Sequence, residues 1–232
     1  MNHEEIVRKV LSSRNAAGAL KSRESNTVEF KESFNKNSTA KYAKTMAAYS
    51  NNRGGYIIFG VKDNPRTIVG LKNENFENMS QEQFSEAINS LFAPAMDWDC
   101  GTLVIEVPAT DGTGTMQSLK IGWIYTAEAE YKPIIAQKPN DGEKINSGDV
   151  YYRYRARSEK IKFAEMSRIV EERTAKEREG LLRLFEVIRD NKTANLGIVN
   201  YSNGKISTPY GVDVAFDRKL VTQVLRKAKF IK

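Results

Sequence analysis

Three acidic residues occupy positions that suggest catalytic chemistry. Glu24 lies just before a short segment of alternating polarity, Glu29 lies within that segment, and Asp63 follows the most apolar segment of the chain. Carboxylates that come within a few ångströms of one another repel, and a divalent cation relieves this repulsion. Mg²⁺ or Mn²⁺ takes oxygen ligands and can activate a water molecule to attack a phosphate. If the three side chains converge, they predict a metal site that cleaves phosphodiesters.

The same positions have a simpler interpretation. Glu29 can be an exposed strand residue, and Asp63 can form a turn before the Asn-Pro that follows it. Glu24 and Glu29 are five residues apart, and this spacing points them to opposite faces of a straight strand. Convergence of the carboxylates therefore requires a bend at Ser25-Asn26.

Basic residues lie beside these acids in the sequence and again near residue 155. Lys31 and Lys62 could hold the scissile phosphate or stabilise the charge that develops on it. In YYRYRARSEK, every second position from Arg153 through Arg155 to Arg157 is arginine. On one straight strand these guanidinium groups would share a face at spacings of about 6.6–7 Å, which suits a row of backbone phosphates. The alternative is that they pair with acidic residues of a neighbouring strand.

The remaining sequence excludes several other chemistries. His3 is the one histidine and is expected to be an ordinary surface residue, so histidine-based triads and histidine-rich zinc sites are excluded. Cys100 is the one cysteine, which excludes an internal disulfide and a cysteine-rich metal site. The chain has no GxxxxGK[ST] phosphate loop, and Gly54-Gly55 precedes a predicted strand rather than a helix. The chemistry that remains possible uses carboxylate, lysine and arginine side chains.

Hydrophobic periodicity predicts the elements that position these residues. Helices are expected over residues 3–14, 39–50, 80–92, 162–179, 181–190 and 218–230, and one continuous helix through residues 174–180 is the alternative to a break there. Strands are expected over residues 27–33, 56–61, 102–109, 118–126, 132–138 and 149–156, the third and fourth forming a hairpin. Together they predict the α+β class, a mixed β-sheet with flanking helices. A main domain is expected over residues 1–175 and a small helix-hairpin-helix α/β appendage of unknown role over residues 176–232.

Charge and composition limit the classes of partner and the location that can be expected for this chain. The chain has 232 residues, of which 40% are hydrophobic and 28% are charged, as in ordinary globular proteins. It begins with charged residues and has no stretch of 18 apolar residues, so a cytoplasmic protein without a membrane span is expected. Residues 1–65 carry 11 basic and 6 acidic side chains, residues 66–150 carry 6 and 13, and residues 151–232 carry 19 and 10. If the two basic ends meet in space, they form a surface that attracts phosphates.

Several motifs together resemble one known family. They are ESNTVEFKES, AAYSNNRGGYIIFGVKDN, IVGL and the closing INSGDVYYRYRARSEK, spread over roughly residues 20–172. This combination resembles the Schlafen-like AlbA-type domain, often described as a DNA-binding domain. In the nuclease members of that group, the two glutamates of E-x4-E and the aspartate after G-V-x cut tRNA or rRNA with a divalent metal. The resemblance assigns these roles to Glu24, Glu29 and Asp63.

Three functions follow as hypotheses. The first is a metal-dependent endoribonuclease that cleaves structured RNA such as tRNA, in antiviral defence or stress. The second is a non-catalytic regulatory module with the same fold that binds DNA or RNA. The third is an interaction domain whose appendage recruits a partner. Because the family's eukaryotic nucleases pair two such lobes in one chain, the resemblance also suggests a homodimer.

Overall fold

The computed structural model describes most of the chain: residues 2–15, 18–108, 115–190, 199–200, 205–207, 213–215, 223 and 226. The chain divides into two compact units, Met1–Ile169 and Val170–Lys232. Residues that carry the predicted chemistry all belong to the first unit.

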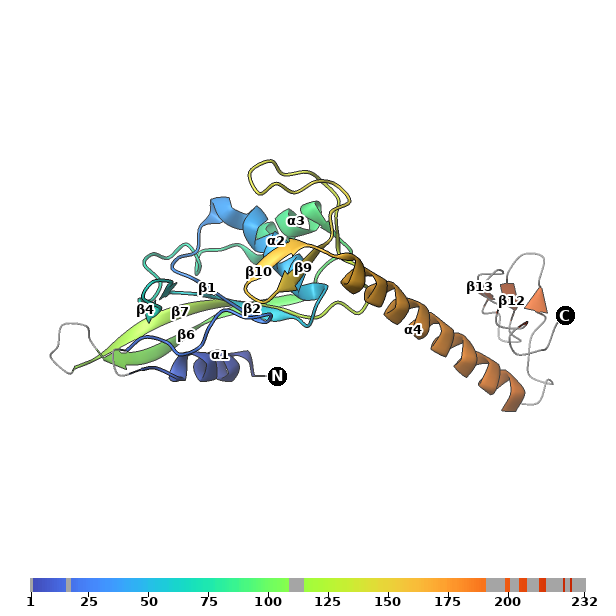
Figure 1. The fold of residues 1–232 in the computed structure, drawn as a ribbon, viewed down its shortest axis with the longest axis horizontal. Coiled ribbons are helices and arrows are strands. Elements are labelled where there is room, and N and C mark those ends of the chain that lie inside the picture. Colours follow the sequence, from blue (N-terminus) through green and yellow to red (C-terminus); the bar gives the residue numbers. More distant parts are fainter. Residues whose placement is uncertain are drawn as a thin grey trace. The chain divides into compact units, whose positions relative to one another are not determined.

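A four-stranded sheet of order β1-β2-β7-β6 forms the centre of the first unit. β1 (Val28–Lys31) runs parallel to β2 (Gly55–Phe59), whereas β7 (Met116–Thr126) is antiparallel to both β2 and β6 (Trp98–Pro108). β6 and β7 form a hairpin that continues beyond the end of β2 (Figure 1). The sheet is therefore mixed, and the predicted α+β class is confirmed.

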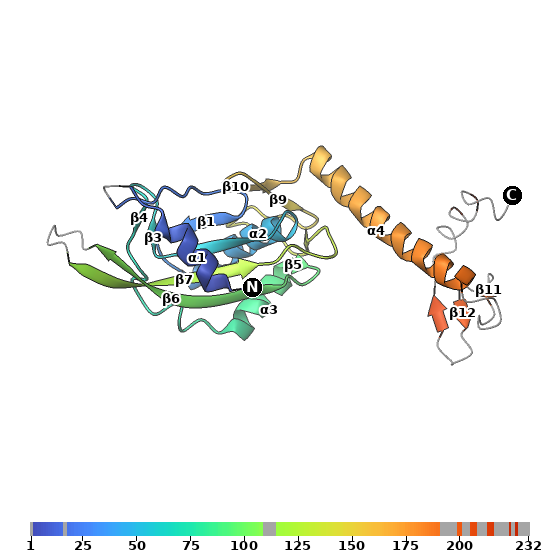
Figure 2. The same ribbon diagram turned by 90° about the horizontal axis from the view of Figure 1, so that it is seen from below.

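Helices cover both faces of this sheet. α2 (Thr39–Ser50) and α3 (Gln81–Leu91) pack on one face, and α1 (His3–Ser12) packs on the other (Figure 1 and Figure 2). Because neighbouring side chains of a strand point to opposite faces, Ile57 enters the core under α2 and α3 while Ile58 enters the core under α1. Burial on both faces explains why β2 is the most apolar segment of the chain.

Smaller elements surround the central sheet. A 3₁₀ helix over Lys36–Ser38 precedes α2. Three two-stranded sheets pair β3 (Val61–Lys62) with β4 (Thr67–Ile68), β5 (Phe92–Ala93) with β8 (Ile135–Ala136), and β9 (Tyr151–Tyr154) with β10 (Arg157–Lys160). The strand expected over residues 132–138 is thus limited to the two residues of β8.

One continuous helix runs through the predicted domain boundary, as the alternative to two separate helices expected. α4 (Phe163–Asp190) runs without a break through residues 175 and 176. The second unit also contains β11 (Val199–Asn200), β12 (Lys205–Ser207) and β13 (Asp213–Ala215), which form an antiparallel sheet. The expected C-terminal helix lies almost wholly outside the described residues. Within the described residues, no helix combines the length and apolar character that crossing a bilayer requires.

Asn51 connects the end of α2 to two distant segments. Its Oδ1 accepts a hydrogen bond from the Ile134 backbone N–H at 2.7 Å. Its Nδ2 donates to the carbonyl oxygens of Ile134 and Tyr151, both at 2.9 Å. Asn51 is fully buried, so each of these backbone groups depends on the amide for its hydrogen bond.

The two glycines that follow allow the chain to leave α2 and enter β2. Gly54 has a φ of +71°, and a Cβ there would lie 2.7 Å from the Thr126 carbonyl oxygen. A Cβ on Gly55 would lie 2.7 Å from the Tyr49 ring and 2.8 Å from the Thr27 carbonyl oxygen. Both positions therefore require glycine for close backbone approach.

His3 differs from its expected place at the surface. It lies in the first turn of α1 and is half-buried, with its Nδ1 2.8 Å from the Tyr56 hydroxyl. Its ring centre lies 4.3 Å from that of Tyr125 and 5.4 Å from that of Trp123. The expectation of an ordinary surface residue is wrong, because α1 packs this ring against the aromatic side chains of β2 and β7.

We expect Asn51→Ala to lower the free energy of unfolding by about 3 kcal/mol, because it leaves three buried backbone groups without hydrogen bonds. Urea denaturation followed by circular dichroism measures the change. The matched control is Asn75→Ala, which truncates an exposed asparagine and should change stability by less than about 0.5 kcal/mol. Equal stabilities of the two variants would contradict this role of Asn51.

Candidate functional site

Glu29 forms a buried ion pair. Only 7% of the residue is exposed, and its Oε2 lies 2.7 Å from Nη1 of Arg153, which is 2% exposed. Its other carboxylate oxygen forms an ion pair with Lys31. Glu29 is therefore not the exposed strand residue of the simpler interpretation, and both of its oxygens are bound to cationic side chains.

The rest of the Arg153 guanidinium is also held. Its Nε donates to the Ser25 carbonyl oxygen and its Nη1 to the Ser158 hydroxyl, both at 3.2 Å. Its Cζ lies 5.2 Å from the centre of the Tyr49 ring, a cation–π distance. Its Nη2 is buried and has no hydrogen-bond partner among the described residues. Arg153 thus ties β9 to the segment before β1 and to α2.

The arginines of YYRYRARSEK do not lie on one strand, so the predicted row of three guanidinium groups is wrong. β9 ends at Tyr154, the chain reverses at Arg155 with a φ of +50°, and Arg157 begins β10 opposite Tyr154. Arg153 points into the protein, as the pairing alternative expected, although its partner belongs to a different sheet. Arg155 and Arg157 are exposed.

Glu24 lies beside β1 because the chain bends at Ser25. The Ser25 hydroxyl accepts hydrogen bonds from the backbone N–H groups of Thr27 and Val28, both at 3.2 Å. Across this bend, Oε1 of Glu24 accepts a hydrogen bond at 3.3 Å from the backbone N–H of Phe30 in β1. The required bend is therefore present, and it brings Glu24 back alongside the strand that carries Glu29.

Asp63 lies in the turn between β3 and β4. Its side chain is 85% exposed, and its Oδ1 is 3.7 Å from Nη2 of Arg66. Lys62, on β3, is exposed as well. Asp63 therefore takes the turn position of the simpler interpretation.

The three carboxylates do not fit a divalent cation in this arrangement. Within the described residues, no group of three or more histidine, cysteine, aspartate or glutamate side chains is placed to hold a metal ion. Arg153 and Lys31 already compensate the charge of Glu29, and Asp63 is paired with Arg66. The catalytic and metal-binding roles of Glu24, Glu29 and Asp63, and the catalytic role of Lys31, stay predictions.

A basic pocket adjoins the buried ion pair. It has a volume of about 430 Å³ and lies between the turn after α2, the β9–β10 hairpin and the beginning of α4. Four arginines and one acidic residue line it: Arg53, Arg153, Arg155, Arg168 and Glu165. The pocket thus joins basic residues from both ends of the sequence, as the charge distribution suggested.

The cations of this pocket differ in how far they are already paired. Arg153 is paired with Glu29, and Arg168 donates a hydrogen bond to the Tyr152 hydroxyl. Arg53 and Arg155 are exposed and form no ion pair with any other described residue. These two guanidinium groups are therefore available to an anion.

Hydrogen bonds fix the other walls of the pocket. The Tyr152 hydroxyl donates to Oδ1 of Asn52 at 2.9 Å, and Nδ2 of Asn52 donates to the Arg153 carbonyl oxygen at 3.1 Å. The Tyr154 hydroxyl donates to Glu165 at 2.6 Å. Burial, and then this hydrogen bond, raise the pKa of Tyr154 to about 12, while the same bond lowers the pKa of Glu165. Glu165 is thus an ionised acceptor held by a neutral phenol.

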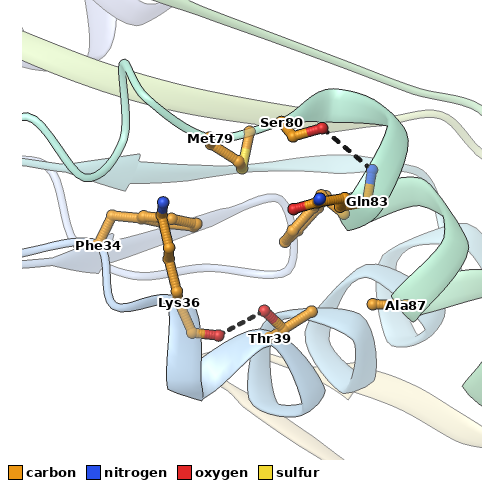
Figure 3. Close-up of a pocket in the computed structure, with 8 residues that line it drawn as sticks. Phe34, Lys36, Thr39, Met79, Ser80, Gln83 and Ala87 are labelled. Carbon is orange, nitrogen blue, oxygen red and sulfur yellow. Dashed lines mark hydrogen bonds between the residues drawn. The ribbon is translucent and has the colours of Figure 1, made fainter.

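A second, smaller pocket offers no comparable chemistry. It has a volume of about 110 Å³ and lies between the beginnings of α2 and α3 (Figure 3). Its polar groups cap helices: the Gln83 backbone N–H donates to the Ser80 hydroxyl at 3.3 Å, and the Thr39 hydroxyl donates to the Lys36 carbonyl oxygen at 2.7 Å. Its apolar lining comes from Phe34, Met79, Phe84 and Ala87. The basic pocket is therefore the better candidate site.

Sequence reasoning missed Arg53, Asn52 and Arg168. The first two lie inside the AAYSNNRGGYIIFGVKDN motif, where neither was identified as a candidate site residue. Arg53 could have been identified from its position between Asn52 and the two glycines, because those residues define the turn and leave the Arg53 side chain as its charged group. Arg168 lies in a helix with many charges and gave no such signal.

We expect Glu29→Gln to lower the free energy of unfolding by about 3 kcal/mol, because it leaves the Arg153 charge buried without a compensating anion. Urea denaturation measures the change. Glu106→Gln is the matched control, since Glu106 is an exposed strand glutamate whose substitution should cost less than about 0.5 kcal/mol. A loss below about 1 kcal/mol for Glu29→Gln would contradict the role of the ion pair.

Comparison with known proteins finds one solved structure and one curated protein that are similar to this chain. The crystal structure of the DIP2311 protein from Corynebacterium diphtheriae matches 70% of this chain and 27% of its own chain, with 17% sequence identity and a TM-score of 0.43. A protein of Ureaplasma parvum serovar 3, named uncharacterized ATP-binding protein UU034, is 55% identical over 232 residues. The match covers 99% of this chain and 65% of that protein, so the chain spans about two-thirds of its length.

The family resemblance is confirmed independently of these two proteins. The model of the family described as Schlafen, AlbA_2 matches residues 24–162, which include β1, the turn after α2, and the β9–β10 hairpin. The chain belongs to the Schlafen AlbA_2 family.

Proposed function

We propose that the chain binds nucleic acid through the basic pocket. The observation that carries this proposal is the pair of exposed guanidinium groups, Arg53 and Arg155, that line one pocket without an ion-pair partner among the described residues. A guanidinium group donates two parallel hydrogen bonds to a phosphate and keeps its charge at any physiological pH. Family membership supports the same partner class.

The buried ion pair supports this function by holding the pocket in place. Arg153 and Asn52 fix β9, so the turn that carries Arg155 begins from a rigid strand. Groups that are positioned before binding lose less conformational entropy when the ligand arrives. Contacts to phosphates carry no base information, so the proposed binding tolerates many sequences and accepts RNA or DNA.

The name of the 55% identical relative raises ATP as a second ligand. This chain lacks the GxxxxGK[ST] loop, so the arginines of the pocket would have to hold the phosphates of ATP. ATP would then compete with nucleic acid for the same residues. Added ATP should therefore displace bound RNA from the protein in a competition assay.

We expect the double substitution Arg53→Ala with Arg155→Ala to weaken binding to single-stranded RNA and to duplex DNA. The slope of log affinity against log salt should become shallower by about 1 to 2, because up to two phosphate contacts are lost. Fluorescence anisotropy across a salt series measures both quantities. The matched control is Lys9→Ala with Lys138→Ala, which removes the same charge from exposed residues that do not line the pocket. An unchanged slope, or an equal change in the control, would place the interface elsewhere.

Metal-dependent cleavage of structured RNA such as tRNA is the second candidate function. One observation favours it: the bend at Ser25 returns Glu24 to β1, where its Oε1 accepts a hydrogen bond at 3.3 Å from the backbone N–H of Phe30, the residue after Glu29. Two of the three predicted carboxylates are therefore neighbours. A homodimer belongs to the same hypothesis, and light scattering at micromolar concentration tests it.

Incubation of tRNA with the protein and Mg²⁺ or Mn²⁺, with and without EDTA, tests cleavage. We expect binding to persist in EDTA, since the arginines of the pocket need no metal. We expect metal-dependent cleavage to be lost in both Glu24→Gln and Asp63→Asn, two substitutions that leave the buried Glu29–Arg153 pair intact. Cleavage that persists in both variants would exclude the predicted catalytic site, and binding without cleavage under every metal would leave the binding function alone.

A further inference from the structure

The arginines of the basic pocket line one pocket from separate elements instead of following one strand. Arg53 comes from the turn after α2, Arg155 from the β9–β10 turn, and Arg168 from α4. A row of cations along a strand suits successive phosphodiesters, each of which carries one negative charge. Cations from three separate elements that line one pocket suit a single group with more than one negative charge.

The charge of the pocket matches such a group. Its four arginines and Glu165 leave a net charge of +3, and the Glu29 carboxylate behind Arg153 does not change this sum because Lys31 pairs with its other oxygen. A phosphate monoester carries a charge between about −1.5 and −2 at pH 7, because its second pKa is about 6. A phosphodiester inside a strand cannot balance the same pocket.

The size of the pocket fits one nucleotide. Its volume of about 430 Å³ lies within the range of about 300–1,000 Å³ that small-molecule sites occupy. Tyr152 and Tyr154 are held by Asn52 and Glu165, so the walls are already formed. Arg153 adds a buried guanidinium whose Nη2 has no partner among the described residues.

We propose that the basic pocket is a terminal-phosphate subsite, which takes the phosphate monoester at the end of a nucleic-acid strand or of a free nucleotide. This inference rests on the proposed binding function and specifies its ligand. Arg53 and Arg155 hold the two ionised oxygens, and the rest of the strand extends from the pocket over the surface. The site therefore selects strand ends over internal phosphates.

Four oligonucleotides of one sequence test the proposal. Three are single-stranded RNAs that carry a 5′-phosphate, a 3′-phosphate or hydroxyl groups at both ends. The fourth is the RNA with two hydroxyl ends, annealed to its complement as a duplex. We expect at least one phosphorylated end to raise affinity by about tenfold, the effect of one or two added charge-assisted hydrogen bonds. The preference should shrink between pH 7.5 and pH 5.5, because the monoester becomes a monoanion below its second pKa of about 6. Adenosine monophosphate and inorganic phosphate, added as competitors, distinguish a strand end from a free nucleotide and from bare phosphate.

Two variants connect the preference to the pocket. Arg155→Ala should abolish the preference for a phosphorylated end, and Arg155→Lys should retain part of it, because lysine keeps the charge but loses the paired hydrogen bonds. Lys138→Ala, outside the pocket, should keep the full preference. Circular dichroism checks that each variant is folded.

The outcomes separate this proposal from the one it rests on. Equal affinity of wild-type protein for phosphorylated and hydroxyl ends overturns the terminal-phosphate subsite. If Arg53→Ala with Arg155→Ala still weakens binding to every ligand in that case, the general nucleic-acid interface stands. If that double variant binds all ligands as the wild type does, both proposals fail.

Discussion

The buried ion pair between Glu29 and Arg153 is the constraint on which the site depends. Removing two charges from water costs several kcal/mol per ion, so such a pair is tolerated only with good geometry and further hydrogen bonds. Arg153 has both, through its 2.7 Å contact to Glu29 and its bonds to Ser25 and Ser158. The pair connects the central sheet to the separate β9–β10 sheet, and the buried amides of Asn51 and Asn52 donate hydrogen bonds to two carbonyl oxygens of β9. β9 is therefore fixed through both its backbone and its Arg153 side chain, and the pocket beside it has a defined shape.

The same pair explains why arginines two residues apart have different roles. Arg153 lies on β9 and points inward to an anion, whereas Arg155 lies in the turn and is exposed. An R-x-R-x-R pattern is compatible with one long strand or with a tight hairpin, and the two arrangements differ only in the backbone at Arg155-Ala156. A turn residue with positive φ is usually glycine or asparagine, and neither occurs there. The sequence therefore had no local signal that the row of arginines was interrupted.

Local periodicity explains what could be predicted. The bounds of α1, α2 and α3, the central position of β2 and the β6–β7 hairpin follow from patterns that repeat within a few turns or residues. The five-residue spacing of two glutamates likewise identified Ser25-Asn26 as the place where a bend would be required if the carboxylates converged. Contacts between distant segments are of another kind: Glu29 and Arg153 are 124 residues apart, and many acids and bases could have met instead. Burial of Glu29 and exposure of Asp63 depend on such contacts, and that is why the three carboxylates could be identified but their arrangement could not.

The pairing of Arg153 also determines where the free charge of the pocket lies. Four guanidinium groups around one pocket would repel one another strongly if all were buried and unpaired. Glu29 removes this cost at the one arginine that is out of contact with water, while Arg53 and Arg155 remain hydrated until a ligand replaces the water. Excess positive charge is thus concentrated on the side chains that reach solvent, where it attracts anions without destabilising the fold. A buried carboxylate in the motif of a predicted catalyst therefore has a structural role in this structure, because it neutralises the arginine beneath the pocket.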